Sequence, residues 1–200
     1  MVKYWQQWQF AVSNDEAFTM PDGEENPFMD NGYQLVGEAD AWMQALQNMI
    51  DLEVDPVILS VSGLQVGKMK VRIAPLDKNG EPGPFDGDRE DLDPFVEDPV
   101  ELKNTEIQFQ VTIPKVTLEV DIKDGGKPKF RDTWIRYRVN DRDIDEDWTE
   151  TEHDQGCVIE PKYGHSKNFK KIVDDDIFKL LTKGKITFQV WGKLTDEVMK

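Results

Sequence analysis

Residues 56–76 read PVILSVSGLQVGKMKVRIAPL, and this stretch decides the class of fold. Met69, Val71 and Ile73 alternate with basic side chains, which is the period-two pattern of a strand with one buried and one solvated face. A Ser-Gly pair separates this strand from the apolar run PVILSV that precedes it. The stretch therefore predicts a β-hairpin.

Further strands are predicted downstream. Their sequences are IQFQVTIPKVTLEVDI (107–122), DTWIRYRV (132–139) and KITFQVWGKL (185–194), each bounded by turn-forming residues. The segment DDDIFKLLTKG predicts a short helix with Asp174 or Asp175 as its N-cap and Gly184 at its end. The strands are too evenly spread for βαβ units, so we expect a mainly all-β, antiparallel domain.

Two regions are less regular. Residues 77–103 hold ten acidic residues and four prolines, a composition that prevents a strand ladder and predicts a surface loop. Residues 34–54, QLVGEADAWMQALQNMIDLEV, combine helix-favouring residues with an alternation that suits a strand.

The N-terminal segment, residues 1–25, stands apart from these strands. Trp5, Trp8 and Val12 fall on one face at helical spacing before the loop-like MPDGEEN. We expect a short helical or extended segment that docks on another surface.

The charge balance excludes some functions. Forty acidic and 24 basic residues give a net charge of −16, which disfavours nucleic acid and anionic membranes as partners. The longest apolar stretches fall short of the roughly 20 residues of a membrane span. The N-terminus lacks a secretory apolar region, and the single cysteine, Cys157, permits no internal disulfide, so we expect an intracellular protein.

Signatures of enzymes are weak in this sequence. GLQVGK (63–68) is one residue short of a phosphate-binding loop, is followed by Met69 in place of Ser or Thr, and sits in a hairpin. The serines lack the context of a catalytic nucleophile. We therefore expect no catalytic activity and no cofactor.

Metal sites are also disfavoured. Asp141, Asp143, Asp145, Asp147 and Glu152 mimic the spacing of an EF-hand loop, but Glu146 replaces its glycine and a strand precedes it. A solvated acidic turn explains these residues better. His153, Cys157 and His165 lack the paired spacing of a zinc site.

Basic residues cluster locally despite the negative net charge. Lysines gather in residues 162–171 and at Lys183 and Lys185, and arginines punctuate the strand around Arg136 and Arg138. A solvated sheet face is the commoner explanation, but the pattern also points modestly to an acidic protein partner.

The strand order resembles that of a known family. IQFQVTIPKV, RDTWIRYRV, WTET and YGHSKNFKKIVDDDIFKLLTKGKITFQVWGKL resemble a C2-type β-sandwich, and especially the non-motor region that follows the forkhead-associated domain in kinesin-3 motors. NPFMDNGYQLVGEADAWMQAL (26–46) and the hairpin resemble that family's Asp-Pro-Phe segment, Gly-x-Ala strand and Lys-Val-x-Ile strand. The likeness covers about residues 26–194 and includes no catalytic motif.

This resemblance implies a C2-like sandwich over residues 26–196 in which 34–47 form a strand. Because 34–76 look like the end of such a sandwich and 106–194 like its beginning, two alternatives follow: one circularly permuted sandwich, which we favour, or two incomplete sheets that need partners. Gly192, Lys193 and Leu194 stand where calcium-dependent C2 domains carry aspartates, which leaves Asp132 and Asp124 alone. Calcium-triggered membrane docking is therefore not expected.

For function, the resemblance implies a non-enzymatic interaction module of the microtubule cytoskeleton, in the cytoplasm, that serves as a cargo adaptor or an axonemal scaffold. The alternative is a calcium-independent, lipid-binding C2 domain. The predicted partner-binding residues are Trp5 and Trp8 as aromatic anchors and Lys167, Lys170 and Lys171 as rim contacts. The competing explanation is that both tryptophans complete the domain's own core.

Overall fold

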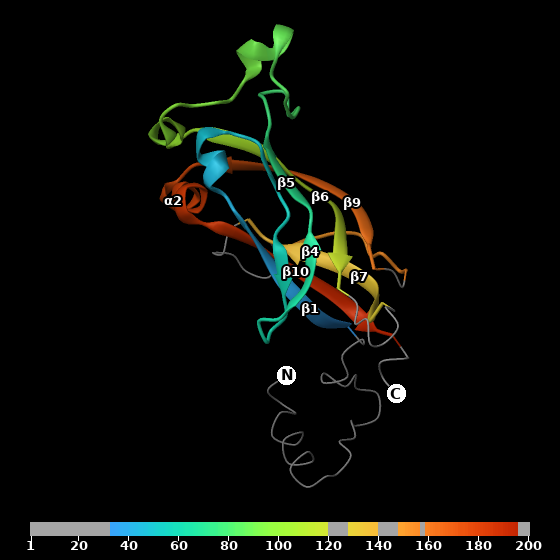
Figure 1. Cartoon of the computed structure of the whole chain (residues 1–200). Helices are drawn as coiled ribbons and strands as arrows, with labels where there is room; N and C mark the ends of the chain where they lie inside the picture. The colour runs from blue at the N-terminus through green and yellow to red at the C-terminus, as the bar shows by residue number, and fades with distance from the viewer. Residues whose placement is uncertain (1–32, 120–127, 140–147, 157–158, 196–200) are drawn as a thin grey trace, which may run out of the picture. The chain divides into compact units, whose positions relative to one another are not determined.

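The computed structural model describes residues 33–119, 128–139, 148–156 and 159–195 (Figure 1). Within these ranges the chain forms ten strands, three 3-10 helices and one α-helix. In chain order they are β1 (Tyr33–Trp42), η1 (Gln44–Asn48), β2 (Leu52–Val54), β3 (Val57–Leu59), β4 (Gln65–Met69), β5 (Val71–Pro75), η2 (Gly87–Leu92), η3 (Pro99–Leu102), β6 (Glu106–Leu118), β7 (Phe130–Tyr137), β8 (Thr149–Glu150), β9 (Lys162–Ile172), α2 (Asp175–Lys183) and β10 (Lys185–Leu194).

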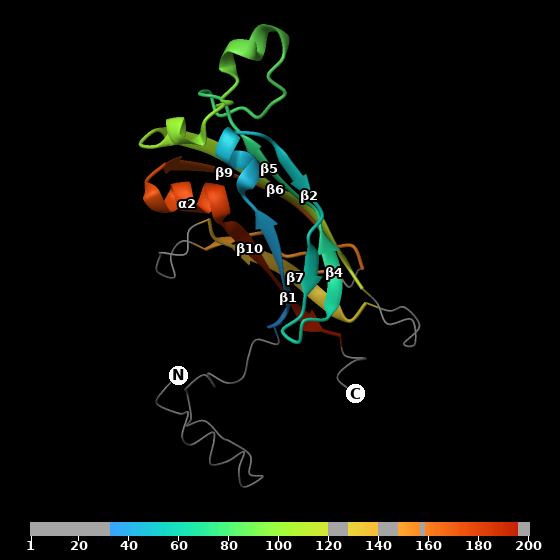
Figure 2. The ribbon, with the colours of Figure 1, turned by 60° about the vertical axis from the view of Figure 1, so that its left-hand side comes forward.

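The strands lie in two facing layers that share strand β6 (Figures 1 and 2). One layer contains β1, β3, β4, β7, β8 and β10, and the other contains β2, β5, β6 and β9. The ring centroids of Phe169 on β9 and Tyr137 on β7 lie 6.1 Å apart. This contact joins the two layers through the core. The predicted, mainly antiparallel β-sandwich is confirmed.

The stretch at 56–76 forms the predicted hairpin of β3 and β4 and then changes layer. Met69, Val71 and Ile73 are fully buried, as their alternation predicts. β4 pairs with residues 116–118 of β6, whereas β5 pairs with residues 109–112 of the same strand. The chain therefore passes from one layer to the other between Met69 and Val71.

Strand β1 settles the ambiguous segment. Residues 34–42 are strand, as expected, whereas Gln44–Asn48 form a 3-10 turn. β1 lies between β3 and β10, so the strands of 33–76 and those of 106–194 belong to one hydrogen-bonded sheet. That continuity fits the single-sandwich alternative, while the permuted strand order relative to other C2 domains stays a prediction.

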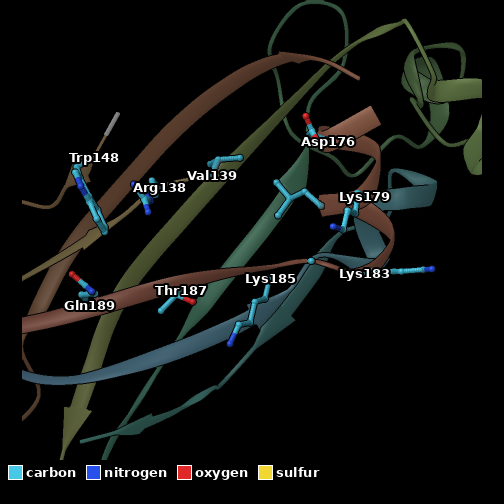
Figure 3. Close-up of a pocket in the computed structure, with 11 residues that line it drawn as sticks. Arg138, Val139, Trp148, Asp176, Lys179, Lys183, Lys185, Thr187 and Gln189 are labelled. Atoms are coloured by element: carbon cyan, nitrogen blue, oxygen red, sulfur yellow. The ribbon is translucent and has the colours of Figure 1, made fainter. Parts of the chain in front are cut away.

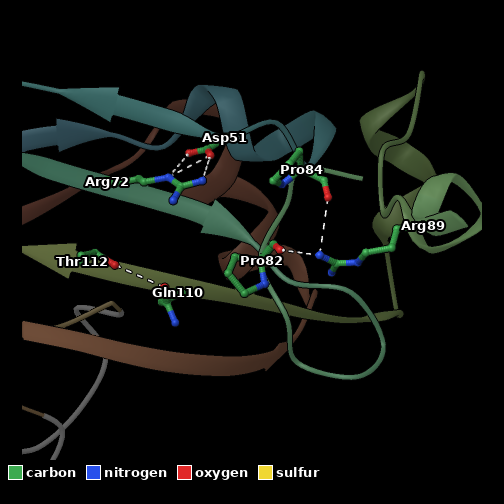
Figure 4. Close-up of polar contacts among 7 residues, drawn as sticks. All are labelled: Asp51, Arg72, Pro82, Pro84, Arg89, Gln110 and Thr112. Carbon is green, nitrogen blue, oxygen red and sulfur yellow. Dashed lines mark hydrogen bonds and ion pairs between the residues drawn. The ribbon is translucent and has the colours of Figure 1, made fainter. Parts of the chain in front are cut away.

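The acidic loop, residues 77–103, contains only the 3-10 helices η2 and η3. Arg89 fastens it by donating hydrogen bonds to the carbonyl oxygens of Pro82 (3.2 Å) and Pro84 (3.5 Å), as Figure 4 shows. Near the base of the loop, the guanidinium of Arg72 holds the carboxylate of Asp51 through two nitrogen atoms. Arg89 therefore ties the loop back onto its own first residues, which directly follow β5.

Helix α2 begins as its sequence predicts. The side chain of Asp174 accepts hydrogen bonds from the backbone N–H groups of Asp176 (3.1 Å) and Ile177 (2.9 Å), and Gly184 is the C-cap. Ile177 and Leu181 are buried, and the helix packs against η1. No helix in the described part of the chain is long and apolar enough to cross a membrane.

Candidate partner-binding surface

The predicted lysine rim lies on β9, a strand that the sequence analysis did not predict. β9 pairs with β6 and, within the described residues, with no other strand, so it is an edge of its layer. Lysines on an edge strand hinder its pairing with another chain. The lysines therefore already have a structural role before any partner is considered.

The register divides these lysines between the two faces of β9. Lys167 lies opposite Val111 and Lys171 opposite Ile107, both of which face the core. Lys170 lies opposite Gln108, so its side chain is on the other face, where its Nζ lies 2.8 Å from Glu106 Oε1. The structure brings Lys167 and Lys171 together and places Lys170 apart from them.

Tyr163, His165 and Phe169 occupy the core side of β9 and are partly buried. His165 Nε2 lies 2.9 Å from the hydroxyl of Tyr137, and burial lowers the pKa of this imidazole, helped by the nearby charge of Lys167. A neutral His165 imidazole can pack against the side chain of Tyr137 on the core side of β9. Packing on the core side of the sandwich is therefore sufficient to explain His165.

Asp132 and His153 form a second polar cluster, near the end of β10. The carboxylate of Asp132 lies 3.0 Å from His153 Nδ1 and 3.1 Å from Lys193 Nζ. A calcium ion bound by Asp132 would have to compete with the ammonium group of Lys193. Within the described ranges no three His, Cys, Asp or Glu side chains are grouped to hold a metal.

Several predicted residues lie outside the described part of the chain. They are the tryptophans Trp5 and Trp8, the acidic residues of 140–147, Asp124 and Cys157. Their roles remain predictions from the sequence.

The outward face of β7 and β10 carries stacked aromatic and arginine side chains. Trp134 stacks on His153 at 5.4 Å between ring centroids and on Trp191 at 6.0 Å. The guanidinium of Arg136 lies 4.5 Å from the centre of the Trp148 ring and 4.8 Å from that of Trp191. These cation–π contacts hold the long side chains in fixed positions on a strand face.

A groove opens beside this face, between helix α2, the outward side of β10 and the end of β7 (Figure 3). Its volume is about 530 Å³. We call it the basic groove, and its lining residues are Arg138, Val139, Trp148, Asp176, Lys179, Leu180, Lys183, Gly184, Lys185, Thr187 and Gln189.

The position of each cation in the basic groove follows from the fold. The guanidinium of Arg138 lies 4.9 Å from the centre of the Trp148 ring. Lys185 Nζ lies 2.6 Å from Asp40 Oδ2, on the side of β1. Lys179 and Lys183 are exposed, one helical turn apart on α2, and neither forms an ion pair with a described residue.

Only part of this groove was predicted from the sequence. The basic clusters around Arg138 and Lys185 were predicted as separate runs, and no role was predicted for Lys179 or Trp148. Pairing of β7 with β10 brings these distant residues together. The missed signal was the i, i+4 spacing of Lys179 and Lys183 on the exposed face of a predicted helix.

Comparisons with known proteins add little. No family model and no curated protein matches the sequence. Among solved structures, a C2 domain of RIM from Drosophila aligns with 44% of this chain and 64% of its own length, at 14% identity and a TM-score of 0.32. The chain thus spans less than two thirds of that C2 domain, whose fold is the one that the sequence resemblance implies. So low a score carries no argument, and the sandwich rests on the strand pairing described above.

Proposed function

We propose that this protein is a non-enzymatic interaction module of the microtubule cytoskeleton, comparable to a kinesin-3 tail region that binds partner proteins. Its role would be that of a cargo adaptor or of a cytoskeletal or axonemal scaffold. The observation that carries the proposal is the basic groove, which gathers positive charge on a chain whose net charge is −16. Microtubule surfaces are acidic, so attachment has to be local.

Two further contacts belong to this proposal. Trp5 and Trp8 serve as aromatic anchors, because large aromatic side chains dominate the energies of interfaces. Lys167 and Lys171, which share one face of β9, supply rim contacts on that side. Lys170 contributes from the opposite face, next to Glu106.

Co-sedimentation of the full chain with microtubules tests the proposal. We expect the Trp5→Ala, Trp8→Ala double variant to pellet less than the wild type while its thermal unfolding midpoint stays the same. Trp42→Ala is the matched control, because Trp42 is 56% exposed on β1 and lies outside the proposed anchor. If the double variant loses stability and still pellets, the two tryptophans are core residues. Failure of the wild type to pellet contradicts the microtubule assignment.

A second candidate function is calcium-independent binding to a membrane surface. The turn between β3 and β4 favours it, because Val61 is 87% exposed and Leu64 is 67% exposed at its tip. Apolar side chains in such positions can enter the headgroup region of a bilayer. Vesicle flotation of the wild type and of the Val61→Ser, Leu64→Ser double variant tests this function. Flotation of the wild type that is lost in the double variant would favour membrane binding over the first function.

A further inference from the structure

We propose that the basic groove binds an extended protein segment rich in glutamate or aspartate. The inference goes beyond the cytoskeletal proposal, since it names a binding site and a ligand class. It does not require microtubules to be the partner.

The charge balance of the basic groove is locally the reverse of that of the whole chain. The chain has 24 basic and 40 acidic residues, whereas the described residues that line the basic groove include four basic side chains, of which Lys185 is paired with Asp40, and one acidic side chain, Asp176. A cleft lined by one sign of charge focuses the local field and attracts ligands of the opposite sign. The described lining of the groove thus favours an anionic ligand, on a chain whose net charge is negative.

Two of the positive charges at the basic groove are available to a ligand. Lys179 and Lys183 are exposed and have no ion-pair partner among the described residues. In Figure 3 the side chain of Lys179 points into the groove, whereas that of Lys183 points outward from its rim. Two ammonium groups a helical turn apart can meet two carboxylates of one extended segment.

The size and shape of the basic groove suit a short protein segment. A volume of about 530 Å³ falls within the range of roughly 300–1,000 Å³ that is typical of ligand clefts, and it greatly exceeds one carboxylate. Val139, Leu180 and the ring of Trp148 add apolar surface, on which the methylene groups of glutamate side chains can pack. A segment of several residues fits these walls better than a small anion does.

A protein segment is favoured over a membrane for an electrostatic reason. The net charge of −16 repels an anionic bilayer, which must approach as a broad surface. A single peptide strand needs only the groove itself for contact and not a broad face of the chain. The screening length of about 10 Å at 0.1 M salt makes this local attraction possible.

Fluorescence anisotropy with a labelled hexaglutamate peptide tests the proposal on the full chain. We expect saturable binding that weakens as salt is added, and no binding of a hexaglutamine peptide. Lys179→Glu, Lys183→Glu should weaken binding by about tenfold, because two attractions become repulsions. Lys68→Glu, Lys78→Glu changes the net charge equally at two exposed lysines outside the groove and should change affinity less than about twofold.

The outcomes separate the alternatives. Equal weakening by both double variants would mean a general charge effect and would overturn the groove as the site. Absence of hexaglutamate binding would overturn the proposal and remove the groove as support for the microtubule assignment, which co-sedimentation of the wild type tests separately. Phosphatidylserine vesicles that bind while the peptide neither binds nor competes would replace it with a membrane contact. If the glutamate pair unfolds the helix, Lys179→Gln, Lys183→Gln is used and should weaken binding about threefold, with Lys68→Gln, Lys78→Gln as control.

Discussion

Asp77 fastens the base of the acidic loop through a buried carboxylate. The residue is 2% exposed, and its Oδ1 accepts hydrogen bonds from the backbone N–H groups of Asn79 (2.7 Å) and Glu81 (3.0 Å). Its Oδ2 lies 3.0 Å from Arg89 Nη2. The hydrogen bond from Glu81, followed by the contacts with Arg89 and Asn79, lowers the pKa of Asp77 despite its burial. The ionised form is therefore the one that holds the loop.

We predict that Asp77→Asn destabilises the fold in a pH-dependent way. A carboxyl group with a lowered folded-state pKa contributes stability above its ordinary pKa of 3.8, and this contribution is lost as the pH falls through the lowered value. The difference between wild type and variant in urea unfolding should be largest above about pH 5 and should shrink as the pH falls below the ordinary pKa. Asp86→Asn, an exposed acid of the same loop, is the control and should show no such change. A difference that is constant with pH would contradict the proposed role of the charge.

At the scale of the element, helix α2 depends on its cap. It has nine residues, a length that is marginal for an isolated helix, so the cap and the packing of Ile177 and Leu181 have to stabilise it. We predict that Asp174→Ala lowers the free energy of unfolding by about 1 kcal/mol, whereas Asp174→Asn retains most of the stability. Urea denaturation monitored by circular dichroism measures both. Equal losses in the two variants would show that charge at the helix start, and not the capping bond, matters.

The elements that could be predicted from the sequence are those whose own residues carry a capping signal or a regular apolar pattern. α2 has a capping residue and a terminal glycine, and buried residues alternate with more exposed ones from Gly67 to Ile73, across the end of β4 and the start of β5. β9 was missed because polar residues occupy both of its faces and Gly164, with a φ of +55°, interrupts its alternation. The hydrogen bonds of β6 stabilise this edge strand, and no local pattern of β9 reports them.

The same limit applies to the candidate site. Lys167, Lys170 and Lys171 are neighbours in sequence, yet the register places Lys170 on the opposite face from the other two. Arg138 and Lys179 are distant in sequence, yet both line one groove. A basic run in a sequence therefore predicted the sign of the surface charge, whereas strand pairing decided which charges act together.

At the scale of the whole described domain, the sheet depends on both halves of the sequence. β1 lies between β3 and β10, and β6 pairs with both β4 and β5. Separating the halves would expose the backbone edges of these strands and uncover buried side chains such as Ile58 and Val111. Two- or three-stranded remnants with an uncovered apolar face are marginal in water.

We therefore predict that residues 28–77 and 104–196, expressed separately, each fail to unfold cooperatively, while the intact chain shows one cooperative transition. The physical reason is that each half supplies only two or three strands to each layer of the shared core, so neither buries enough apolar surface to offset the conformational entropy of its own folding. Thermal and urea unfolding of both fragments, alone and mixed, measures this. Recovery of a cooperative transition on mixing would show that the two halves assemble through the β1–β10 and β4–β6 pairings. Cooperative unfolding of either fragment by itself would instead mean two independent sheets, and the single-sandwich interpretation would be wrong.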